Sequence, residues 1–174
     1  MPDPDTLPYA LQRLSDETAI ARAEALADRL KQDFPHLTFV LNGGLADNAS
    51  CVAQLQRGAM IDGVALDGVM VGRAAYHNPW LMADWDELLF GLPPREQALT
   101  REAVEAEMVA YTEREMARTA GWAHGEVRWP QVIRHILGLY HGLPGARRWR
   151  QVWSDHKLKD LPPTDVMAIA HQRP

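Results

Sequence analysis

The apolar positions of the chain follow a helical period first and then short continuous runs. After an irregular lead of fourteen residues, Ser15 is a suitable N-cap for a helix to about Asp33, and Pro35 prevents its continuation. Residues 37–41 are then a short apolar, β-rich run that ends at Asn42-Gly43-Gly44. Such a run predicts a buried parallel strand with a glycine turn at its carboxyl end.

The same order is repeated once. A second helix is expected over about residues 46–56, and residues 68–71 form another short apolar run, closed by Gly72-Arg73. Asp62-Gly63-Val64 duplicates the triplet at 67–69 and leaves the start of this strand open. Helices alternating with short strands predict βα units of a parallel sheet. A complete (β/α)8 TIM barrel needs about 250 residues, so we expect an incomplete barrel.

Beyond Pro79 the pattern is helical. Leu92-Pro93-Pro94 is typical of a linker, so we place an α/β domain over residues 1–95 and an all-α domain over residues 96–174. Helices are expected from Thr100 to Ala120, from Pro130 to Tyr140, and over residues 146–154 and 163–171. Trp80 and Trp85 are expected to pack the helical part onto the barrel. The inward positions are expected to be Val104, Met108, Tyr111, Met116, Val132, Ile133, Ile136, Leu137, Tyr140, Trp149, Val152 and Trp153.

Composition excludes several classes of protein. No run of about 18 apolar residues exists, so no membrane span is expected. The acidic, proline-rich start is unlike a signal peptide. Cys51 is the single cysteine, which excludes an internal disulfide and fits a reducing cytoplasm. We expect it to be a small buried packing residue, and since no Cys/His cluster has zinc-like spacing, we expect no metal.

The net charge of −5 argues against a nucleic-acid partner, but the charge is unevenly distributed. Residues 128–159 contain seven basic side chains against Asp155 alone, a local charge of +6, so the rest of the chain carries −11. A basic block inside an acidic protein is what a localised phosphate-binding surface requires. The alternative is a solvated basic face without a partner.

The two glycine turns each close a predicted strand. In (β/α) barrels the loops after the last two strands frequently form a phosphate site. Glycine lets backbone N–H groups approach an anion closely, and Arg73 adds a fork of donors that matches phosphate oxygens. The alternative is two ordinary βα turns in which glycine serves turn geometry only.

Two long motifs in this order resemble the tRNA-dihydrouridine synthase family, its A subfamily in particular. The first comprises residues 34–38, the Leu-Asn-Gly-Gly of residues 41–44 and residues 67–79, which read DGVMVGRAAYHNP. The second, residues 134–150, reads RHILGLYHGLPGARRWR and is similar to that subfamily's C-terminal helical domain. The resemblance runs from about residue 30 to the end and covers the end of the barrel and the helical domain.

The resemblance implies a flavoenzyme. Members of this family hold FMN at the mouth of the barrel, NADPH reduces it, and a uridine of tRNA accepts the hydride while a cysteine acts as general acid. On the positions that match, FMN-phosphate contacts fall on Asn42, Gly43, Gly44, Gly72 and Arg73. In the basic helical region it implies tRNA contacts by Arg134, Arg147, Arg148, Arg150 and Lys157.

The catalytic part of the family pattern has no match. Its cysteine belongs to an earlier barrel loop, nothing before residue 30 resembles that loop, and Cys51 is not a substitute. We therefore assign no catalytic residue and expect the chain to be inactive alone, with partner association through an uncovered barrel edge. The alternative function is a non-catalytic tRNA-binding or interaction module. Arg134 could instead pair with an acidic residue of the long helix.

Overall fold

A computed structural model describes residues 16–60 and 65–172 of the chain. Their contacts divide the chain into two compact units, Met1–Gly72 and Arg73–Pro174. This division falls ahead of the domain boundary that we placed at residues 95 and 96, which stays a prediction. The expected cap at Ser15 and the duplicated Asp62-Gly63-Val64 lie outside the described residues.

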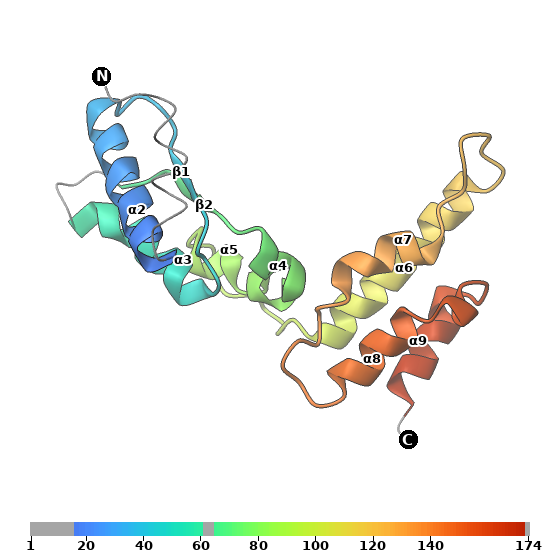
Figure 1. Ribbon diagram of the computed structural model, residues 1–174. Helices are drawn as coiled ribbons and strands as arrows, with labels where there is room; N and C mark the ends of the chain where they lie inside the picture. Colours follow the sequence, from blue (N-terminus) through green and yellow to red (C-terminus); the bar gives the residue numbers. More distant parts are fainter. Residues whose placement is uncertain (1–15, 61–64, 173–174) are drawn as a thin grey trace. The chain divides into compact units, whose positions relative to one another are not determined.

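The first unit has the predicted helix–strand–helix–strand order. Its elements are α2 (Asp16–Asp33), β1 (Val40–Asn42), α3 (Asn48–Met60) and β2 (Gly68–Met70), which Figure 1 shows as two helices beside a short strand pair. The strands are parallel, and the register pairs Val40 with Gly68 and Asn42 with Met70. The prediction of parallel βα units is confirmed.

The first strand is shorter than predicted because side chains bind the backbone ahead of it. The half-exposed Asp67 carboxylate accepts the N–H of Phe39 at 2.8 Å. Lys31 donates to the carbonyl of Leu37 at 2.9 Å and to Asp67 at 2.7 Å. The Phe39 carbonyl still accepts the N–H of Asp67 at 3.1 Å, but the Phe39 N–H and the Leu37 carbonyl are bonded to side chains, and the strand begins at Val40 rather than at Leu37.

Burial of these strands differs from the prediction. Leu41 is buried, but Val40 is 53% and Met70 47% exposed. Successive side chains of a strand point to opposite faces, so the register places Val40, Gly68 and Met70 on one open face. The sheet described here therefore has one covered face and one uncovered apolar face.

The second unit is helical in the described residues, with three longer helices and shorter pieces before and between them, as Figure 1 shows. The helix α6 (Arg101–Thr119) begins as predicted at Thr100, whose hydroxyl accepts the N–H of Ala103 at 3.1 Å. The predicted helices at 146–154 and 163–171 are also present, as α8 and α9. The elements are α4 (Arg73–His77), η1 (Pro79–Met82), α5 (Trp85–Leu88), α6, α7 (Trp129–Ile133), η2 (Arg134–Ile136), α8 (Ala146–Trp153), η3 (His156–Leu158) and α9 (Pro163–His171).

The helix predicted from Pro130 to Tyr140 is wrong in its second half. After Ile133 the chain tightens into a 3-10 turn, and the N–H of Leu139 bonds the carbonyl of Ile136 at 2.8 Å. A 3-10 helix has three residues per turn. Ile133, Ile136 and Leu139 follow that spacing and are all buried, so packing of this stripe selects the tighter turn.

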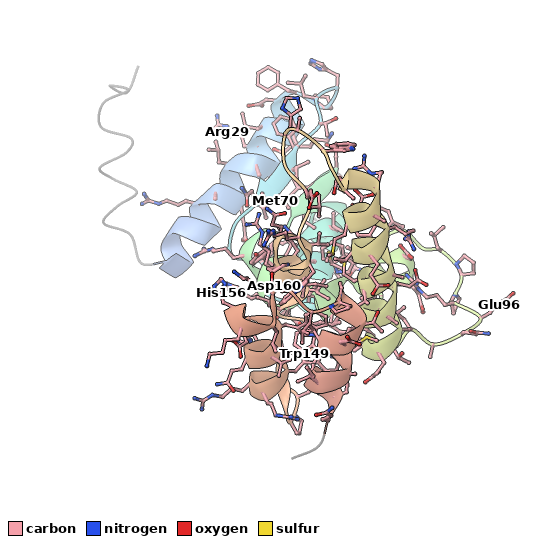
Figure 2. All side chains as sticks on the ribbon, turned by 90° about the vertical axis from the view of Figure 1, so that its right-hand side faces the viewer. Arg29, Met70, Glu96, Trp149, His156 and Asp160 are labelled. Atoms are coloured by element: carbon pink, nitrogen blue, oxygen red, sulfur yellow. The ribbon has the colours of Figure 1, made fainter. Side chains whose placement is uncertain are left out.

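The core of the second unit lies between α6, α7, α8 and α9. Trp149 and Trp153 are buried as expected, and Figure 2 shows Trp149 inside the helices and Glu96 at an outer loop. Trp80 also packs against this core. Tyr111, which we expected inward, is 45% exposed. It lines an apolar hollow of about 530 Å³ along α6, because the buried stripe of this helix runs through Glu105, Val109 and Thr112.

No helix within residues 16–60 or 65–172 is long and apolar enough to cross a membrane.

Candidate functional site

The two predicted glycine turns leave the sheet at the same edge. Asn42 pairs with Met70, so Gly43 and Gly44 follow β1 where Val71 and Gly72 follow β2. Gly43 and Gly44 have φ angles of 116° and 70°, a region that side chains with a Cβ rarely adopt. A Cβ added at Gly43 would meet no atom within 4 Å. The glycines thus expose backbone at the carboxyl edge of both strands.

The helix that follows the first turn is capped by its own carboxylate. Asp47 accepts the N–H of Ser50 at 2.7 Å, and this bond is the main cause that lowers the pKa of Asp47. The first turn of α3 therefore already has an anionic partner. An anion at this sheet edge would be held by the glycine turn and not by the end of α3. Cys51, one residue further, is fully buried as predicted, and burial raises its pKa.

Arg73 begins the second unit, as the first residue of α4, and is exposed. This short helix packs against the turn that carries Arg134. The Tyr76 hydroxyl donates to the carbonyl of Arg134 at 3.3 Å, and the Tyr76 and His135 rings lie 5.9 Å apart. A Cβ on Gly138 would lie 2.1 Å from the carbonyl oxygen of His77, so only glycine fits there.

The predicted RNA-contacting side chains are not equally available. Arg147 and Arg150 on α8 and Lys157 on η3 are exposed. Arg148 is half-buried and donates to the carbonyl of Gln172 at the end of α9. In the described part of the chain Arg134 has no ion pair with α6, and its Nε lies 3.3 Å from His135 Nε2 instead. Three cations of the predicted set therefore present free charge beside a fourth that is already hydrogen-bonded.

Sequence reasoning missed a buried carboxylate on α6. Glu105 is fully buried, and its Oε1 accepts the indole N–H groups of Trp149 at 2.8 Å and Trp153 at 2.9 Å. Its Oε2 accepts the Tyr140 hydroxyl at 3.0 Å and lies 2.6 Å from His171 Nε2. Burial first, and then the Glu105 charge, raise the pKa of Tyr140. The signal in the sequence is its spacing, because Glu105, Val109 and Thr112 form one helical stripe.

Comparison with known proteins assigns the family. A model of the dihydrouridine synthase (Dus) family matches residues 17–171, which is most of the chain. The chain belongs to the dihydrouridine synthase family. The predicted resemblance is therefore confirmed, and both long motifs lie within the matched residues.

Three relatives within this family carry the name tRNA-dihydrouridine(20/20a) synthase. The Pseudomonas aeruginosa protein is 43% identical over 141 residues, which are 78% of this chain and 36% of that protein. The Vibrio cholerae protein is 39% identical over 76% of this chain and 36% of its own length. The Shewanella oneidensis protein is 37% identical over 83% and 38%. This chain thus spans little more than a third of the relatives that it matches.

Proposed function

We propose that this chain carries the flavin-phosphate end of a (β/α)8 barrel and the tRNA-binding helical domain of a flavin-dependent tRNA-dihydrouridine synthase. Such an enzyme reduces uridine in tRNA to 5,6-dihydrouridine with NADPH and FMN. The observation that carries the proposal is the exit of Asn42-Gly43-Gly44 and Gly72 from one edge of a parallel strand pair. Ligands of parallel α/β sheets bind at the carboxyl ends of the strands.

The open sheet face supports a barrel. Parallel strands are normally covered on both faces, whereas Val40 and Met70 leave one apolar face uncovered in the described residues. The inner face of a TIM barrel is filled by such aliphatic side chains from several strands. Strands that closed a barrel opposite this pair would cover the open face.

The residues at the sheet edge suit the phosphate of FMN. Gly43 and Gly44 offer backbone N–H groups without a Cβ in the way, and Asn42 adds a side-chain donor. Arg73, which we propose for the same phosphate, follows Gly72 directly in the sequence. Among backbone hydrogen bonds outside the helices and the sheet, none in the described residues uses the N–H of Gly44 or Gly72. FMN, when bound, supplies the hydride transfer, and these residues orient it.

Two flavins that differ in one group test the phosphate role. FMN carries a phosphate and riboflavin does not, so the chain should bind FMN more tightly, if weakly, in a fluorescence titration. Replacing Arg73 with glutamine should remove most of that difference, while Arg95→Gln, which removes the partner of Asp86 instead, should not. Equal affinity for both flavins would contradict the phosphate role. Flavin that co-purified at near-unit stoichiometry would contradict weak binding.

Turnover separates an enzyme from a binding module. We propose that no residue of this chain takes the role of the catalytic cysteine; its single cysteine, Cys51, is buried in α3. With NADPH, FMN and unmodified tRNA, the 174-residue polypeptide is expected to form no dihydrouridine. Dihydrouridine formed by the polypeptide alone would refute this expectation.

Salt dependence tests the tRNA surface. Arg147 and Arg150 are exposed on α8, and each phosphate contact adds about 0.7–0.9 to the slope of log K against log salt. Replacing both with glutamine should lower that slope by roughly 1.5. The matched control replaces Arg22 and Arg29 on α2, which removes the same charge from the other unit. Equal slopes for the two double variants would remove Arg147 and Arg150 from the surface.

A further inference from the structure

One tryptophan of the helical unit is on the surface. Trp122 is 49% exposed, whereas Trp129, Trp149 and Trp153 are buried. It belongs to the loop of residues 121–125 that follows α6, here named the Trp122 loop. Gly121 and Gly125 bound this loop with φ angles of 75° and 108°. Tryptophan is enriched at interfaces, where an apolar ring and a polar N–H are used together.

The Trp122 loop is fixed and not merely exposed. The N–H of Trp122 donates to the carbonyl of Thr119 at 3.1 Å, and the N–H of Gly125 donates to the carbonyl of Trp122 at 3.1 Å. The Glu126 carboxylate accepts the N–H of Gly121 at 2.8 Å. These bonds order the backbone of the loop before any partner arrives, which lowers the entropy cost of binding.

One contact of the ring is already made by a cation. The Arg118 guanidinium lies 4.9 Å from the centroid of the Trp122 ring. The Arg118 guanidinium donates three hydrogen bonds to the Glu115 carboxylate, the shortest at 2.6 Å, so its charge is balanced. The Glu115–Arg118 pair supports the indole and is not a free phosphate-binding cation.

The surroundings of the ring favour a nucleobase over a protein. Between Thr112 and Arg128, Trp122 is the large apolar side chain that is exposed in the described structure. A protein interface needs a contiguous apolar patch, and residues 113–127 add no second large exposed apolar side chain to Trp122. A base needs one flat ring, and stacking on an aromatic side chain tolerates any base. Arg128, where the basic block begins, follows three residues after the loop; its side chain is exposed and lies 4.0 Å from the Asp160 carboxylate.

We propose that Trp122 is a stacking site for an unpaired base of the RNA that the helical unit binds. The site rests on the proposed tRNA binding and adds to it a contact with a base, where the arginines of α8 contact phosphates. A base on Trp122 would stack against a ring that Arg118 supports. Stacking of this kind releases few counterions, so it strengthens binding without changing the salt slope.

Binding of an unmodified tRNA transcript to the full chain tests the site. Trp122→Ala should weaken binding about 5- to 150-fold with an unchanged salt slope, and Trp122→Phe, which keeps a ring, should weaken it less. Arg118→Gln should give an intermediate loss. Wild-type protein should lose tryptophan emission when RNA binds, and Trp122→Phe should show less of this quenching. The control variant is Trp85→Phe, and circular dichroism should show that every variant is folded.

The outcomes separate this site from the proposed function. If Trp122→Ala binds tRNA as tightly as wild type, the stacking site is wrong and the tRNA surface stands. The stacking site is also wrong if the salt slope falls as it does for the Arg147 and Arg150 double variant, because the loss would then be electrostatic. If no form of the chain binds tRNA, both are wrong.

Discussion

Glu105 offers the sharpest test of what holds the helical unit together. Its buried carboxylate lies between α6, α8 and α9 and accepts two indole N–H groups and one phenol. Glu105→Ala leaves the N–H groups of Trp149 and Trp153 without an acceptor in a closed core. Glu105→Gln keeps an oxygen for the indoles and places an amide N–H₂ opposite Tyr140 and His171, whose oxygen and ring nitrogen can accept.

The expected magnitudes follow from these bonds. A hydrogen bond to a charged group contributes about 1.5–3 kcal/mol, and each buried group left unsatisfied costs about 1–3 kcal/mol. Glu105→Ala should therefore lower the free energy of unfolding by about 3–5 kcal/mol, as breaking a buried polar network does. Glu105→Gln loses only the charge and should cost about 1–3 kcal/mol. In a domain of about 100 residues, each 1 kcal/mol lowers Tm by roughly 4–8 °C.

Urea and thermal unfolding, followed by circular dichroism, measure the stability of each variant. The matched control is Glu107→Ala, which removes an exposed carboxylate from the same helix and should change stability by less than about 0.5 kcal/mol. The indole N–H proton signals of Trp149 and Trp153 should also shift in Glu105→Ala. If Glu105→Ala is no less stable than Glu107→Ala, the carboxylate is not the hub that the distances indicate.

Three further results are expected. Gly138→Ala places a Cβ 2.1 Å from the His77 carbonyl oxygen and should lower stability by about 1–3 kcal/mol or more; calorimetry showing an unchanged Tm would contradict that contact. The bond from Lys31 first, then that from Phe39 N–H, lowers the pKa of Asp67. The contribution of Asp67 to the free energy of unfolding is complete above the ordinary carboxyl pKa. It is lost as the pH falls through the lower pKa of the folded chain. In unfolding measured from pH 7 to 2.5, Asp67→Asn should lose less stability toward low pH than the wild type. The same loss of stability in both proteins would refute the assignment. Cys51 should react with iodoacetamide slowly in the folded chain and quickly in urea, because burial protects it and raises its pKa; equal rates would contradict its burial.

The order of elements could be predicted because it depends on local signals. Thr100 caps α6 by its hydroxyl, and Pro163 begins α9, both as their residue types favour. The position of the first strand could be predicted, but its length could not. Its start depends on Lys31 and Asp67, which lie 36 residues apart in the sequence. A side chain that binds backbone over such a separation leaves no periodic trace in the sequence.

The errors in the helical unit have one cause, which is that packing selects among locally similar structures. The residues from 129 to 140 fit an α-helix by propensity, but Ile133, Ile136 and Leu139 pack at the spacing of a 3-10 helix. The spacing of Glu105 with Val109 and Thr112 was the one signal of its burial, but it argues against the usual rule that a lone carboxylate is seldom fully buried. Glu105 Oε1 accepts indole N–H groups from α8, which is far from Glu105 in the sequence and reaches it only in the folded chain.

Arg73 belongs to a different part of the fold than its place in the sequence suggests. Sequence places this arginine with the second glycine turn, next to Gly72. The contacts place it in the second unit, on a helix that packs against Arg134, His135 and Gly138. The side chain proposed to hold the flavin phosphate and those proposed to hold tRNA are thus carried by one compact unit. Because Gly138 admits no Cβ against His77, a larger side chain at position 138 would move the helix that carries Arg73 relative to the basic helices. Such a change would affect the proposed binding of flavin and tRNA although Gly138 is proposed to contact neither.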